Sequence, residues 1–379
     1  MNSTYDCAII GGGLSGLAAA IQLSKKGHLV VLLEKNFYPF HKVCGEYISM
    51  ESWKFLEELG LPLKEINPPI INRFGLTHPK GKQLDVKLPL GGFGLSRYFL
   101  DDQLSTLAVQ NGVIVLQGTA AERISFDSKV QEHIIYNQYG EIHAKTAIGA
   151  YGKRSKLDKK LRRPSTSGFK RPEDNYVGIK YHVKSDIEPD RIELHLFEGG
   201  YAGMSRVEDD KTCFCYLVNS KVLKRYNGDI DKVEEKVLGR NPFLQDRMRA
   251  MTKLFTEPLT ISQIEFGEKE QVFNHILMAG DTAGMITPLT GNGMSLGMHA
   301  SKLVAESIDM FLQGKTNQKK LEKSYERQWE KRFGARVRRG RTFQKWFLNE
   351  EFSGKLIGAL RHFPPIAKAI IKSSHGKPY

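Results

Sequence analysis

The stretch from Tyr5 to Glu34, YDCAIIGGGLSGLAAAIQLSKKGHLVVLLE, is the feature that most constrains how this chain folds. Its apolar run over 7–10 is typical of a buried parallel strand, a helical pattern follows over 14–26, and 28–33 forms a second strand-like run. Three glycines in the spacing GxGxxG join the first strand to the helix: Gly11, Gly13 and Gly16. The sequence therefore predicts a strand–helix–strand unit that binds a dinucleotide.

Each glycine of this motif has its own physical task. Gly11 permits a tight turn, Gly13 lets backbone N–H groups approach a pyrophosphate, and Gly16 allows the helix to pack closely on the strand. The phosphates are expected at the positive end of the helix, and Glu34, at the end of the second strand, is expected to hold a ribose hydroxyl. The expected cofactor contacts also include three neighbours: Leu14, Ser15 and Lys35.

Length and charge narrow the classes of partner. A chain of 379 residues exceeds one typical core, so two lobes are expected, with a ligand between them. The 56 basic and 42 acidic side chains leave a net charge of +14, which favours anionic partners such as phosphorylated metabolites, an acidic carrier protein or a membrane surface. Nucleic acid is not expected, because no recognised nucleic-acid module is present and the basic residues are spread over many segments.

The cysteines indicate neither a metal site nor a disulfide framework. Cys7, Cys44, Cys213 and Cys215 fit no zinc-binding or CxxC spacing, so no metal ligands are expected and a reduced, cytoplasmic chain is the simplest interpretation. The first residues lack the basic and apolar pattern of a signal peptide, and no stretch approaches the ~18 apolar residues of a membrane span.

A loop that mixes aromatic and charged residues, 35–46, follows the second strand. A loop in this place reaches the reactive end of a cofactor bound by the first turn. It contains one thiol, Cys44, which is the candidate for managing a proton during catalysis. A plain buried thiol is the alternative interpretation of the same residue.

A second glycine-rich segment follows the apolar run 276–279 and precedes a helical pattern over 295–311. Asp281, directly after Gly280, is expected to accept hydroxyls of a ribose or ribityl chain, and the N–H groups near 291–294 are expected to face a flavin ring. The remaining candidate residues of the segment are Pro288, Gly291, Asn292, Gly293 and Met294. A loop with a capping aspartate is the alternative.

Strand patterns dominate two further stretches. Residues 70–88 read as a hairpin and 176–266 as several strands with helices near 229–238 and 242–251, and the glycines at 199, 200 and 203 interrupt the middle of this stretch. Four aromatic side chains of this region are candidates for an apolar pocket or for core packing: Phe197, Tyr201, Phe214 and Tyr216. Because alternate strand residues point to opposite faces, at most half of them line such a pocket.

Two further segments are a basic loop in the middle of the chain and a helical region at its C-terminus. The basic run 153–171 is expected to be a mobile loop. Tyr325, Trp329, Phe333 and Val337 recur every four residues among arginines, which favours an amphipathic helix that caps the core, with docking to a carrier protein or membrane as the alternative.

The predicted architecture is α/β: a Rossmann-like FAD-binding domain, a discontinuous β-rich substrate domain and a helical C-terminus. The FAD-binding domain comprises 1–69, 96–172 and 270–312. The substrate domain comprises 70–95 and 173–269, and the helical region comprises 313–379.

With both glycine motifs in place, residues 1–311 resemble flavoproteins of the para-hydroxybenzoate hydroxylase fold group, and more closely geranylgeranyl reductase-like enzymes. Gly11, Gly13, Gly16 and Glu34 resemble the FAD adenosine and pyrophosphate site, and the segment from Gly280 to Gly293 resembles the one that follows the flavin. The resemblance implies that Lys42, Cys44 and Gly45 lie in a loop beside the flavin. It also implies that Arg97, at the start of a helix over 97–110, approaches the cofactor.

Two positions depart from the family pattern. Many monooxygenases of this group have an Asp-Gly pair where this chain has Tyr151-Gly152, which argues against direct use of a pyridine nucleotide, although NAD(P)H stays a candidate electron donor. The isoprenoid reductases tend to carry a YxWxFP segment where this chain has 200–206, GYAGMSR, so the resemblance does not extend to an isoprenoid substrate.

Three functions follow from this constellation. A reductase would pass hydride through FAD to an apolar or aromatic small molecule or a carrier-bound group, and a monooxygenase would hydroxylate or epoxidise a similar substrate. One fold supports both chemistries. A flavin-holding or carrier-binding module without turnover is the third interpretation. If NAD(P)H does not reduce the flavin directly, a separate reductase is a candidate partner that supplies the electrons.

Overall fold

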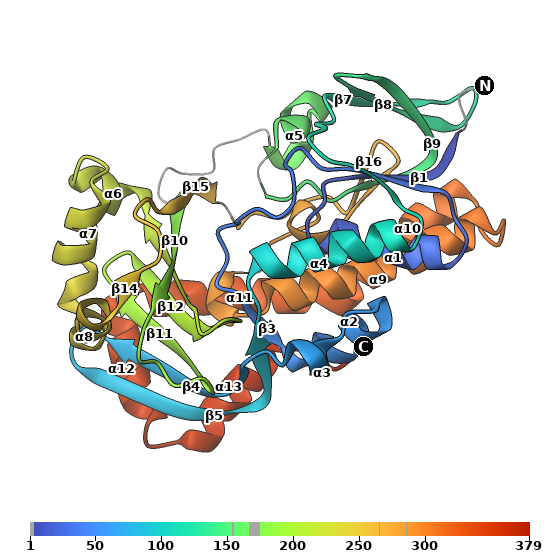
Figure 1. Cartoon of the computed structure of the whole chain (residues 1–379). Coiled ribbons are helices and arrows are strands. Elements are labelled where there is room, and N and C mark those ends of the chain that lie inside the picture. The colour runs from blue at the N-terminus through green and yellow to red at the C-terminus, as the bar shows by residue number, and fades with distance from the viewer. Residues whose placement is uncertain (1–3, 154, 167–174, 265, 286) are drawn as a thin grey trace.

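The computed structural model describes residues 4–153, 155–166, 175–264, 266–285 and 287–379. Two sheets at opposite ends of the molecule organise these residues, as Figure 1 shows, and helices connect and cover them. The predicted α/β fold class with a helical C-terminal region is confirmed.

The first sheet is largely parallel and has the order β16-β17-β9-β1-β2-β6, with the hairpin of β7 and β8 attached to β9. Its central strands are continuous buried apolar runs, as expected of parallel strands that are covered on both faces. The strands are β1 (Tyr5–Ile10), β2 (Val30–Leu33), β6 (Ile114–Leu116), β7 (Arg123–Asp127), β8 (Glu132–Asn137), β9 (Gly140–Gly149), β16 (Val272–Phe273) and β17 (Ile276–Met278).

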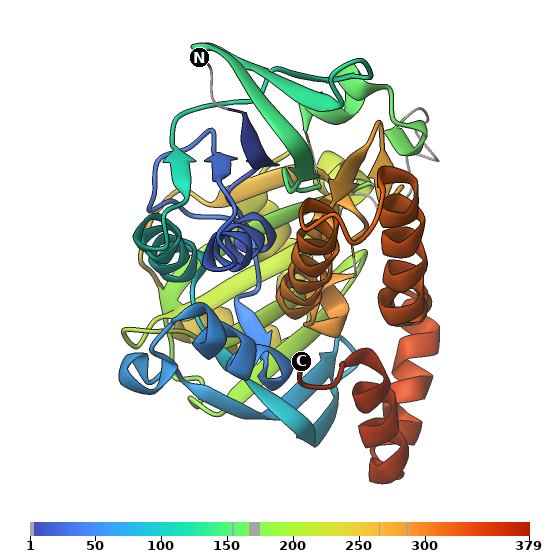
Figure 2. The same cartoon turned by 90° about the vertical axis from the view of Figure 1, so that its right-hand side faces the viewer.

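One row of helices lies across this sheet: α4, α1, α9 and α10, which Figure 2 shows nearly end-on. Their bounds are α1 (Leu14–Lys25), α4 (Arg97–Gln110), α9 (Gly293–Leu312) and α10 (Gln318–Trp329). Both α1 and α9 begin directly after a glycine-rich loop at the carboxyl ends of strands. The fold therefore brings the two sequence motifs to one edge of one sheet.

The second sheet is mostly antiparallel, in the order β14-β10-β13-β12-β11-β4-β5-β3, with β15 paired to β10 and β11 parallel to β4. Its strands are β3 (Tyr47–Ser49), β4 (Ile70–His78), β5 (Lys82–Gly94), β10 (Tyr176–Lys184), β11 (Arg191–Phe197), β12 (Gly200–Arg206), β13 (Thr212–Asn219), β14 (Thr252–Lys253) and β15 (Leu259–Ile264). Residues 47–49, which sequence analysis places in the FAD-binding domain, pair with β5 in this sheet.

The predicted interruption is correct at Gly199, which lies in the turn between β11 and β12 with φ +72°, and wrong at Gly200 and Gly203, because 200–206 form a complete strand between β11 and β13. A side chain at Gly200 would meet the Leu217 backbone oxygen at 2.1 Å and the Phe197 ring at 2.5 Å. The glycine is therefore there for close packing within the strand and does not mark a break in it.

The two faces of the second sheet have different covers. One face packs against α6 (Ser220–Arg225), α7 (Ile230–Lys236) and α8 (Pro242–Ala250). Of the four aromatic candidates, Phe197, Phe214 and Tyr216 belong to this core, and only Tyr201 lies on the other face, beside Leu289. Three of the four are therefore core residues, and only Tyr201 stays a candidate for a pocket on the other face.

The C-terminal helices cover part of that other face. They are α11 (Ala335–Leu348), α12 (Glu350–Leu360) and α13 (Pro364–Ser374), and a π-helical stretch (Glu330–Gly334) joins α10 to α11. Tyr325, Trp329, Phe333 and Val337 are all buried in the main core, so the predicted core-capping helix is confirmed. The remaining helices are α2 (Trp53–Leu59), α3 (Leu63–Ile66) and α5 (Lys156–Leu161).

Helix α5 and a 3₁₀ turn (Pro164–Thr166) occupy part of the segment expected to be a loop, 153–171. Arg163 explains the order, because its buried guanidinium donates to Asp158 at 2.8 Å and to the Thr282 backbone oxygen at 3.2 Å. The prediction is wrong for these residues, while Arg154 and 167–171 lie outside the described part of the chain. Among the described residues, no helix is long and apolar enough to cross a membrane.

Candidate FAD site

The first glycine motif forms a turn that only residues without a side chain can make. Gly11 has φ +107°, and a Cβ there would lie 2.5 Å from the Ala150 backbone oxygen. A Cβ at Gly16 would lie 2.0 Å from the Gly11 oxygen, so α1 packs directly on the end of β1. The geometry agrees with the tasks expected of these two glycines.

Gly13 lies at the N-terminus of α1 beneath two cations. A Cβ at this position would lie 3.6 Å from Arg97 Nη2 and 3.6 Å from Lys42 Nζ. A single carboxylate binds both cations: Asp101 accepts from Lys42 at 2.9 Å and from Arg97 at 2.8 and 2.7 Å. The three side chains leave one positive charge beside the amide groups of the helix N-terminus, which is an arrangement suited to a pyrophosphate.

Burial and pairing set the charges of this cradle. Burial opposes ionisation of Asp101, yet Arg97 and Lys42 hold the pKa of its carboxyl below the ordinary value. Burial lowers the pKa of the Lys42 ammonium. Burial also acts to lower the pKa of the Arg97 guanidinium, but the charge and hydrogen bonds of Asp101 outweigh it, so that pKa is raised above its usual range. The family resemblance placed Asp101 in the same arginine-led helix as Arg97, Leu100 and Leu104 but gave it no role, although its i, i+4 spacing from Arg97 is the signal that could have revealed the ion pair.

Asp101→Asn is expected to lower the unfolding temperature of the apoprotein and to increase the rise in that temperature when FAD binds. The change leaves two cations with no carboxylate, at a cost on the order of 3–5 kcal/mol, and a bound pyrophosphate would offset part of it. Thermal unfolding with and without FAD measures both effects. Asp102→Asn is the matched control, because it removes the same charge at the adjacent, partly exposed position. Equal FAD-induced shifts in the two variants would contradict this role for Asp101.

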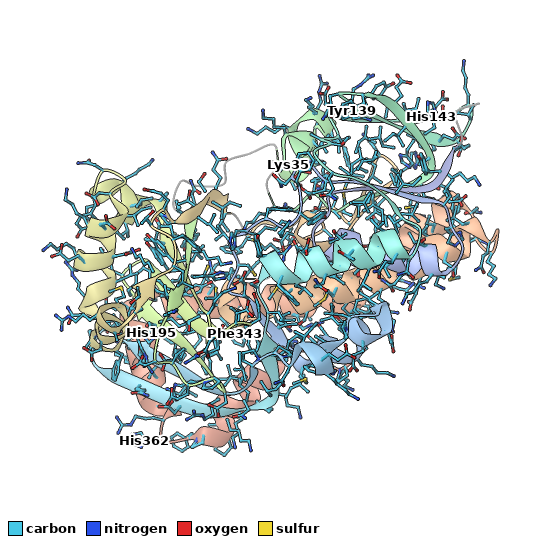
Figure 3. All side chains as sticks on the ribbon, viewed as in Figure 1. Lys35, Tyr139, His143, His195, Phe343 and His362 are labelled. Carbon is cyan, nitrogen blue, oxygen red and sulfur yellow. The ribbon has the colours of Figure 1, made fainter. Side chains whose placement is uncertain are left out.

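Glu34 and its neighbours border the glycine loop. The Glu34 carboxylate is buried and accepts hydrogen bonds from the Gly12 backbone N–H at 2.9 Å and from Asn36 at 3.0 and 2.8 Å. Tyr38 donates to the Gly12 oxygen. Lys35 follows with an exposed side chain (Figure 3). The structure therefore places Glu34 at the loop, and Lys35 at the surface next to it.

The second glycine segment meets the first at Ser15. Gly280 has φ +60°, and a Cβ there would lie 2.5 Å from Ser15 Oγ, which donates to the Gly297 oxygen at 3.0 Å. Gly152 N–H donates to Thr282 Oγ1 at 2.8 Å, so the turn after β17 is also fixed to the end of β9. Gly297, one turn into α9, was missed because an isolated helical glycine gives no sequence signal.

Buried polar atoms without partners gather around 287–292. Thr287 Oγ1, Asn292 Oδ1 and the Tyr47 hydroxyl have no hydrogen-bond partner among the described residues. A Cβ at Gly291, where φ is +63°, would lie 3.3 Å from the Tyr47 ring. Because native proteins seldom leave buried polar atoms unpaired, these atoms point to a polar ligand here. They agree with the predicted place of the flavin end of the cofactor.

The other predicted residues lie along the same path between the two loops. Leu14 is buried at the first turn of α1, and Met294 is buried at the first turn of α9 after Gly293. Asp281 is partly buried directly after Gly280, and Pro288 begins a 3₁₀ turn (Pro288–Thr290) that ends at Gly291. The contacts given above join the two glycine segments through Ser15 and join Lys42 and Arg97 to the first of them.

The loop 42–46 crosses from the phosphate cradle to the second sheet. Cys44 is partly buried, its Sγ accepts from the Glu46 N–H at 3.5 Å, and its backbone oxygen accepts from Cys213 Sγ at 3.2 Å. The Gly45 oxygen accepts from Ser205 at 3.4 Å. The predicted catalytic thiol therefore lies between the two lobes.

Glu46 anchors this loop in a fully buried ionic cluster that the sequence did not reveal. Its carboxylate accepts from Lys180 Nζ, from His182 Nε2 at 2.6 Å and from the Arg97 N–H at 2.7 Å. Burial opposes its ionisation, but Lys180 and then His182 hold its carboxyl pKa below the ordinary value. Burial acts to lower the pKa of the Lys180 ammonium, but the charge of Glu46 outweighs it, so that pKa is raised.

Glu46, His182 and Cys213 are also close enough for one metal ion, with their donor atoms within 4.8 Å of one another. Two contacts argue against a metal here. Lys180 places an ammonium on the same carboxylate, and the 2.6 Å separation of the histidine and carboxylate atoms is that of a hydrogen bond. We therefore describe the group as an ionic cluster.

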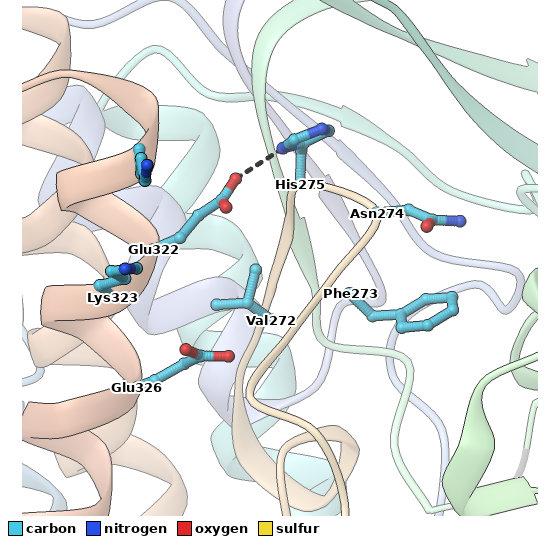
Figure 4. Close-up of a pocket in the computed structure, with 8 residues that line it drawn as sticks. Val272, Phe273, Asn274, His275, Glu322, Lys323 and Glu326 are labelled. Carbon is cyan, nitrogen blue, oxygen red and sulfur yellow. Dashed lines mark hydrogen bonds and ion pairs between the residues drawn. The ribbon is translucent and has the colours of Figure 1, made fainter.

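Two open depressions of about 500 and 530 Å³ lie elsewhere, on the first lobe. Figure 4 shows the first, between the β16–β17 hairpin and α10, where His275 Nδ1 lies 2.7 Å from Glu322. The second is lined by residues of β6, β8 and β9 and their loops, including Tyr139. Neither is lined by a residue of the glycine motifs.

Comparison with known families decides the cofactor. Residues 4–339 match the profile of the FAD binding domain family. The chain belongs to this family. The match covers both glycine motifs and the cradle, so the predicted FAD cofactor is confirmed, and the residues described above fit it through one net cation and three unpaired polar atoms.

Curated relatives resemble the chain over most of its length. A digeranylgeranylglycerophospholipid reductase 2 from Methanothermobacter thermautotrophicus is 26% identical over 358 residues, which cover 90% of this chain and 87% of that protein. The conditioned medium factor receptor 1 of Dictyostelium discoideum is 25% identical over 362 residues, covering 88% of this chain and 68% of that protein.

Solved structures share the fold. A geranylgeranyl bacteriochlorophyll reductase-like protein from Thermoplasma acidophilum has a TM-score of 0.77 at 18% identity and covers 100% of this chain and 97% of its own. A flavin-dependent brominase has a TM-score of 0.77 at 16% identity, covering 98% and 93%. The predicted resemblance is confirmed, and the chain is an FAD-dependent oxidoreductase.

Proposed function

We propose that this protein reduces a carbon–carbon double bond of an apolar, lipid-class substrate through FAD. The observation that carries the proposal is the loop 42–46, which places a partly buried thiol between the FAD cradle and the substrate sheet. The reductase relatives support it. Four matching proteins, including the one described above, are named digeranylgeranylglycerophospholipid reductase, with or without the number 2, and are 24–26% identical to this chain over at least 84% of their own length.

In this proposal Lys42, Arg97 and the α1 N-terminus hold the pyrophosphate, and the 280–294 segment holds the flavin end. Reduced FAD held there would supply a hydride to one carbon of the double bond, and a proton would have to reach the other carbon. The chain contributes position and that proton. Cys44 is the candidate donor, because it is the thiol of the loop between the cradle and the second sheet, where the Glu46 N–H donates to its Sγ and fixes its position.

The substrate would lie on the face of the second sheet that carries Tyr201 and Leu217. This face meets Met285 and Leu289 of the second glycine segment in one apolar cluster. An apolar surface continuous with the flavin segment suits a hydrocarbon chain and offers little to orient a charged metabolite. We do not assign an isoprenoid in particular, because the 200–206 strand lacks the aromatic segment of that branch.

The source of electrons is part of the proposal. Tyr151 does not imitate the missing aspartate, because its hydroxyl donates to Asp158 at 2.8 Å, which occupies it within the fold. We therefore favour a separate reductase or electron carrier over direct reduction by NAD(P)H. An anaerobic titration of the FAD-loaded protein with NADPH, then NADH, tests this, and bleaching of the flavin spectrum would contradict it.

The reaction is tested under argon with chemically reduced, FAD-loaded protein and a panel of unsaturated apolar lipids, polyprenyl and non-isoprenoid. We expect the flavin to reoxidise as the lipid gains two hydrogen atoms per double bond. An absolute requirement for oxygen, with oxygen in the product, would instead establish the monooxygenase alternative that the brominase fold also accommodates. A flavin that never cycles with any substrate would favour the non-catalytic module, the role nearest to the receptor named among the relatives.

Cys44→Ala is expected to slow this anaerobic reoxidation by roughly 10²–10⁴-fold, the usual contribution of a positioned acid. FAD binding should persist, because the hydrogen bond given for the thiol is from the Glu46 N–H and not from Lys42 or Arg97. Cys215→Ala is the matched control. Its thiol is partly exposed on the face of the second sheet that carries Leu217, and its Sγ has no hydrogen bond to another described residue. Equal rates in both variants would remove Cys44 from the chemistry.

We also place the protein in the cytoplasm. The support is the set of cysteines: all four are free, and two of them, Cys7 and Cys213, are buried without a disulfide. An acidic carrier protein would be compatible with the net charge of +14, but no feature of the site favours one.

A further inference from the structure

The C-terminal helices expose large apolar side chains. Trp346 is 41% exposed, Phe352 43%, Phe363 58% and Ile366 53%. Isolated exposed apolar residues are ordinary, but these four fall within 21 residues at the end of α11, along α12 and at the start of α13. They make one surface, which we call the α12 face.

Helical spacing joins these residues. On α12 and its end, residues 352, 356, 359 and 363 recur at intervals of four, three and four, so they form a single stripe. Trp346 extends the stripe at one end, with its ring 5.9 Å from that of Phe352. Ile366, one turn into α13, extends it at the other end.

Basic side chains are frequent in the same part of the chain. Residues 340–379 contain seven lysines and arginines and two glutamates, which gives 7 − 2 = +5. Five of them are exposed on α11, α12, α13 and their connections: Lys345, Lys355, Arg361, Lys368 and Lys372, of which Lys355 pairs with Glu351. Exposed aromatic and aliphatic side chains on helices with a net positive charge are the pattern of a surface that lies in the interface of an anionic bilayer.

The opposite side of the same helices reaches the substrate sheet. Ile357, Leu360 and Ala367 are buried in the cluster that contains Tyr201 and Leu289. Figure 1 shows α12 and α13 beside β4 and β5. One thin layer of helices therefore separates the α12 face from the apolar surface where we place the substrate.

We propose that the α12 face binds the surface of an anionic phospholipid bilayer, so that a lipid substrate passes from the bilayer to the second sheet. The purpose of this surface rests on the proposed function, but the binding itself does not. The helices lie on the bilayer, with Trp346 and Phe363 at the level of the headgroups and the lysines beside the phosphates.

The test is co-sedimentation of the FAD-loaded full-length protein with vesicles of phosphatidylglycerol and phosphatidylcholine, compared with phosphatidylcholine alone. We expect binding to the anionic vesicles that falls as salt increases. Phe352→Ser with Phe363→Ser should reduce the partition coefficient by at least about tenfold, because two apolar anchors are lost. Tyr139→Ser is the matched control, since Tyr139 is an 80% exposed aromatic residue on the other lobe.

Three outcomes would overturn the proposal: no binding to anionic vesicles, equal loss with Tyr139→Ser, or binding only to an acidic protein. Anaerobic turnover of a detergent-solubilised substrate separates this proposal from the proposed function. The double variant should retain that turnover, because its changes are on the outer side of α12. Vesicle binding without turnover would contradict the reductase proposal alone, and turnover without vesicle binding would contradict the membrane proposal alone.

Discussion

Gly13→Val is expected to weaken FAD binding by at least roughly 100-fold, or about 2.7 kcal/mol, while the protein stays folded. A Cβ at this position makes only ordinary contacts, 3.6 Å from the Arg97 and Lys42 nitrogens, so the apoprotein can accept it. The two methyl groups of valine would occupy the space beneath those cations and keep a pyrophosphate away from the N–H groups of α1. Fluorescence titration of the apoprotein with FAD measures the loss.

The neighbouring glycines would not give a clear result. A side chain at Gly16 would lie 2.0 Å from the Gly11 oxygen, so loss of FAD there would reflect a damaged fold. Gly267→Val is the matched control, because an added Cβ at Gly267 meets no atom within 4 Å and the position lies outside both motifs. FAD affinity within about threefold of the parent in Gly13→Val would contradict the cradle described here.

The parts of the site that could be predicted from sequence are those with local patterns. The glycine spacing, the acid at the end of β2 and the 97–110 helix depend on residues that are near one another in the chain, and the observed bounds of α4 match that prediction. Turns and caps enforce such elements regardless of the remaining fold.

What could not be predicted depends on contacts between distant segments. Glu46 pairs with residues 134 and 136 positions away, and nothing near it in the sequence distinguishes it from a surface acid. Arg163 was assigned to a basic loop because two of its partners, Glu270 and Thr282, are more than 100 residues away, and Asp158 nearby gives no signal without them. Glycine in β12 was taken for a break, because the Phe197 ring and the Leu217 oxygen that require it come from neighbouring strands.

The same limit explains the C-terminal helices. The four-residue spacing of large apolar residues correctly indicated a buried face for 325–337, because a continuous amphipathic stripe must be covered. Over 346–366 a similar pattern is exposed instead, and sequence alone cannot distinguish a stripe covered by the core from one left at the surface. Only the packing of α12 on β5 decides which side faces inward.

Glu46→Gln is expected to lower the free energy of unfolding by about 3–5 kcal/mol, because it leaves the fully buried Lys180 ammonium without its counter-charge. The amide also presents one acceptor where His182, Lys180 and the Arg97 N–H now share two. Urea unfolding of the FAD-loaded protein measures the loss. FAD affinity should fall as well, because Glu46 holds both the 42–46 loop and the start of α4, which carry the two cations of the cradle.

Removing both charges distinguishes pairing from packing. Glu46→Gln combined with Lys180→Met should recover most of the lost stability, since no buried charge is then left unpaired. Glu351→Gln is the matched control for loss of an ion pair. It removes the charge that pairs with Lys355 on the surface of α12, where solvent screens the interaction, and it should leave the free energy of unfolding unchanged. A double variant as unstable as Glu46→Gln would show that the carboxylate acts through its geometry and not through the pair.

The dependence on pH follows from the directions of the two shifts. The Glu46 carboxyl has a pKa below 4.5 in the fold, so its contribution is present above the unfolded value and is lost as pH falls through the folded one. The Lys180 ammonium has a pKa above 10.5, so its contribution is present below that value and is lost as pH rises through the folded one. The stability gap between the parent and Glu46→Gln should therefore be nearly constant from about pH 5 to about pH 9 and shrink in stronger acid. A gap that closes near neutral pH would mean that Glu46 takes up a proton there, and that the buried pair is not ionised under ordinary conditions.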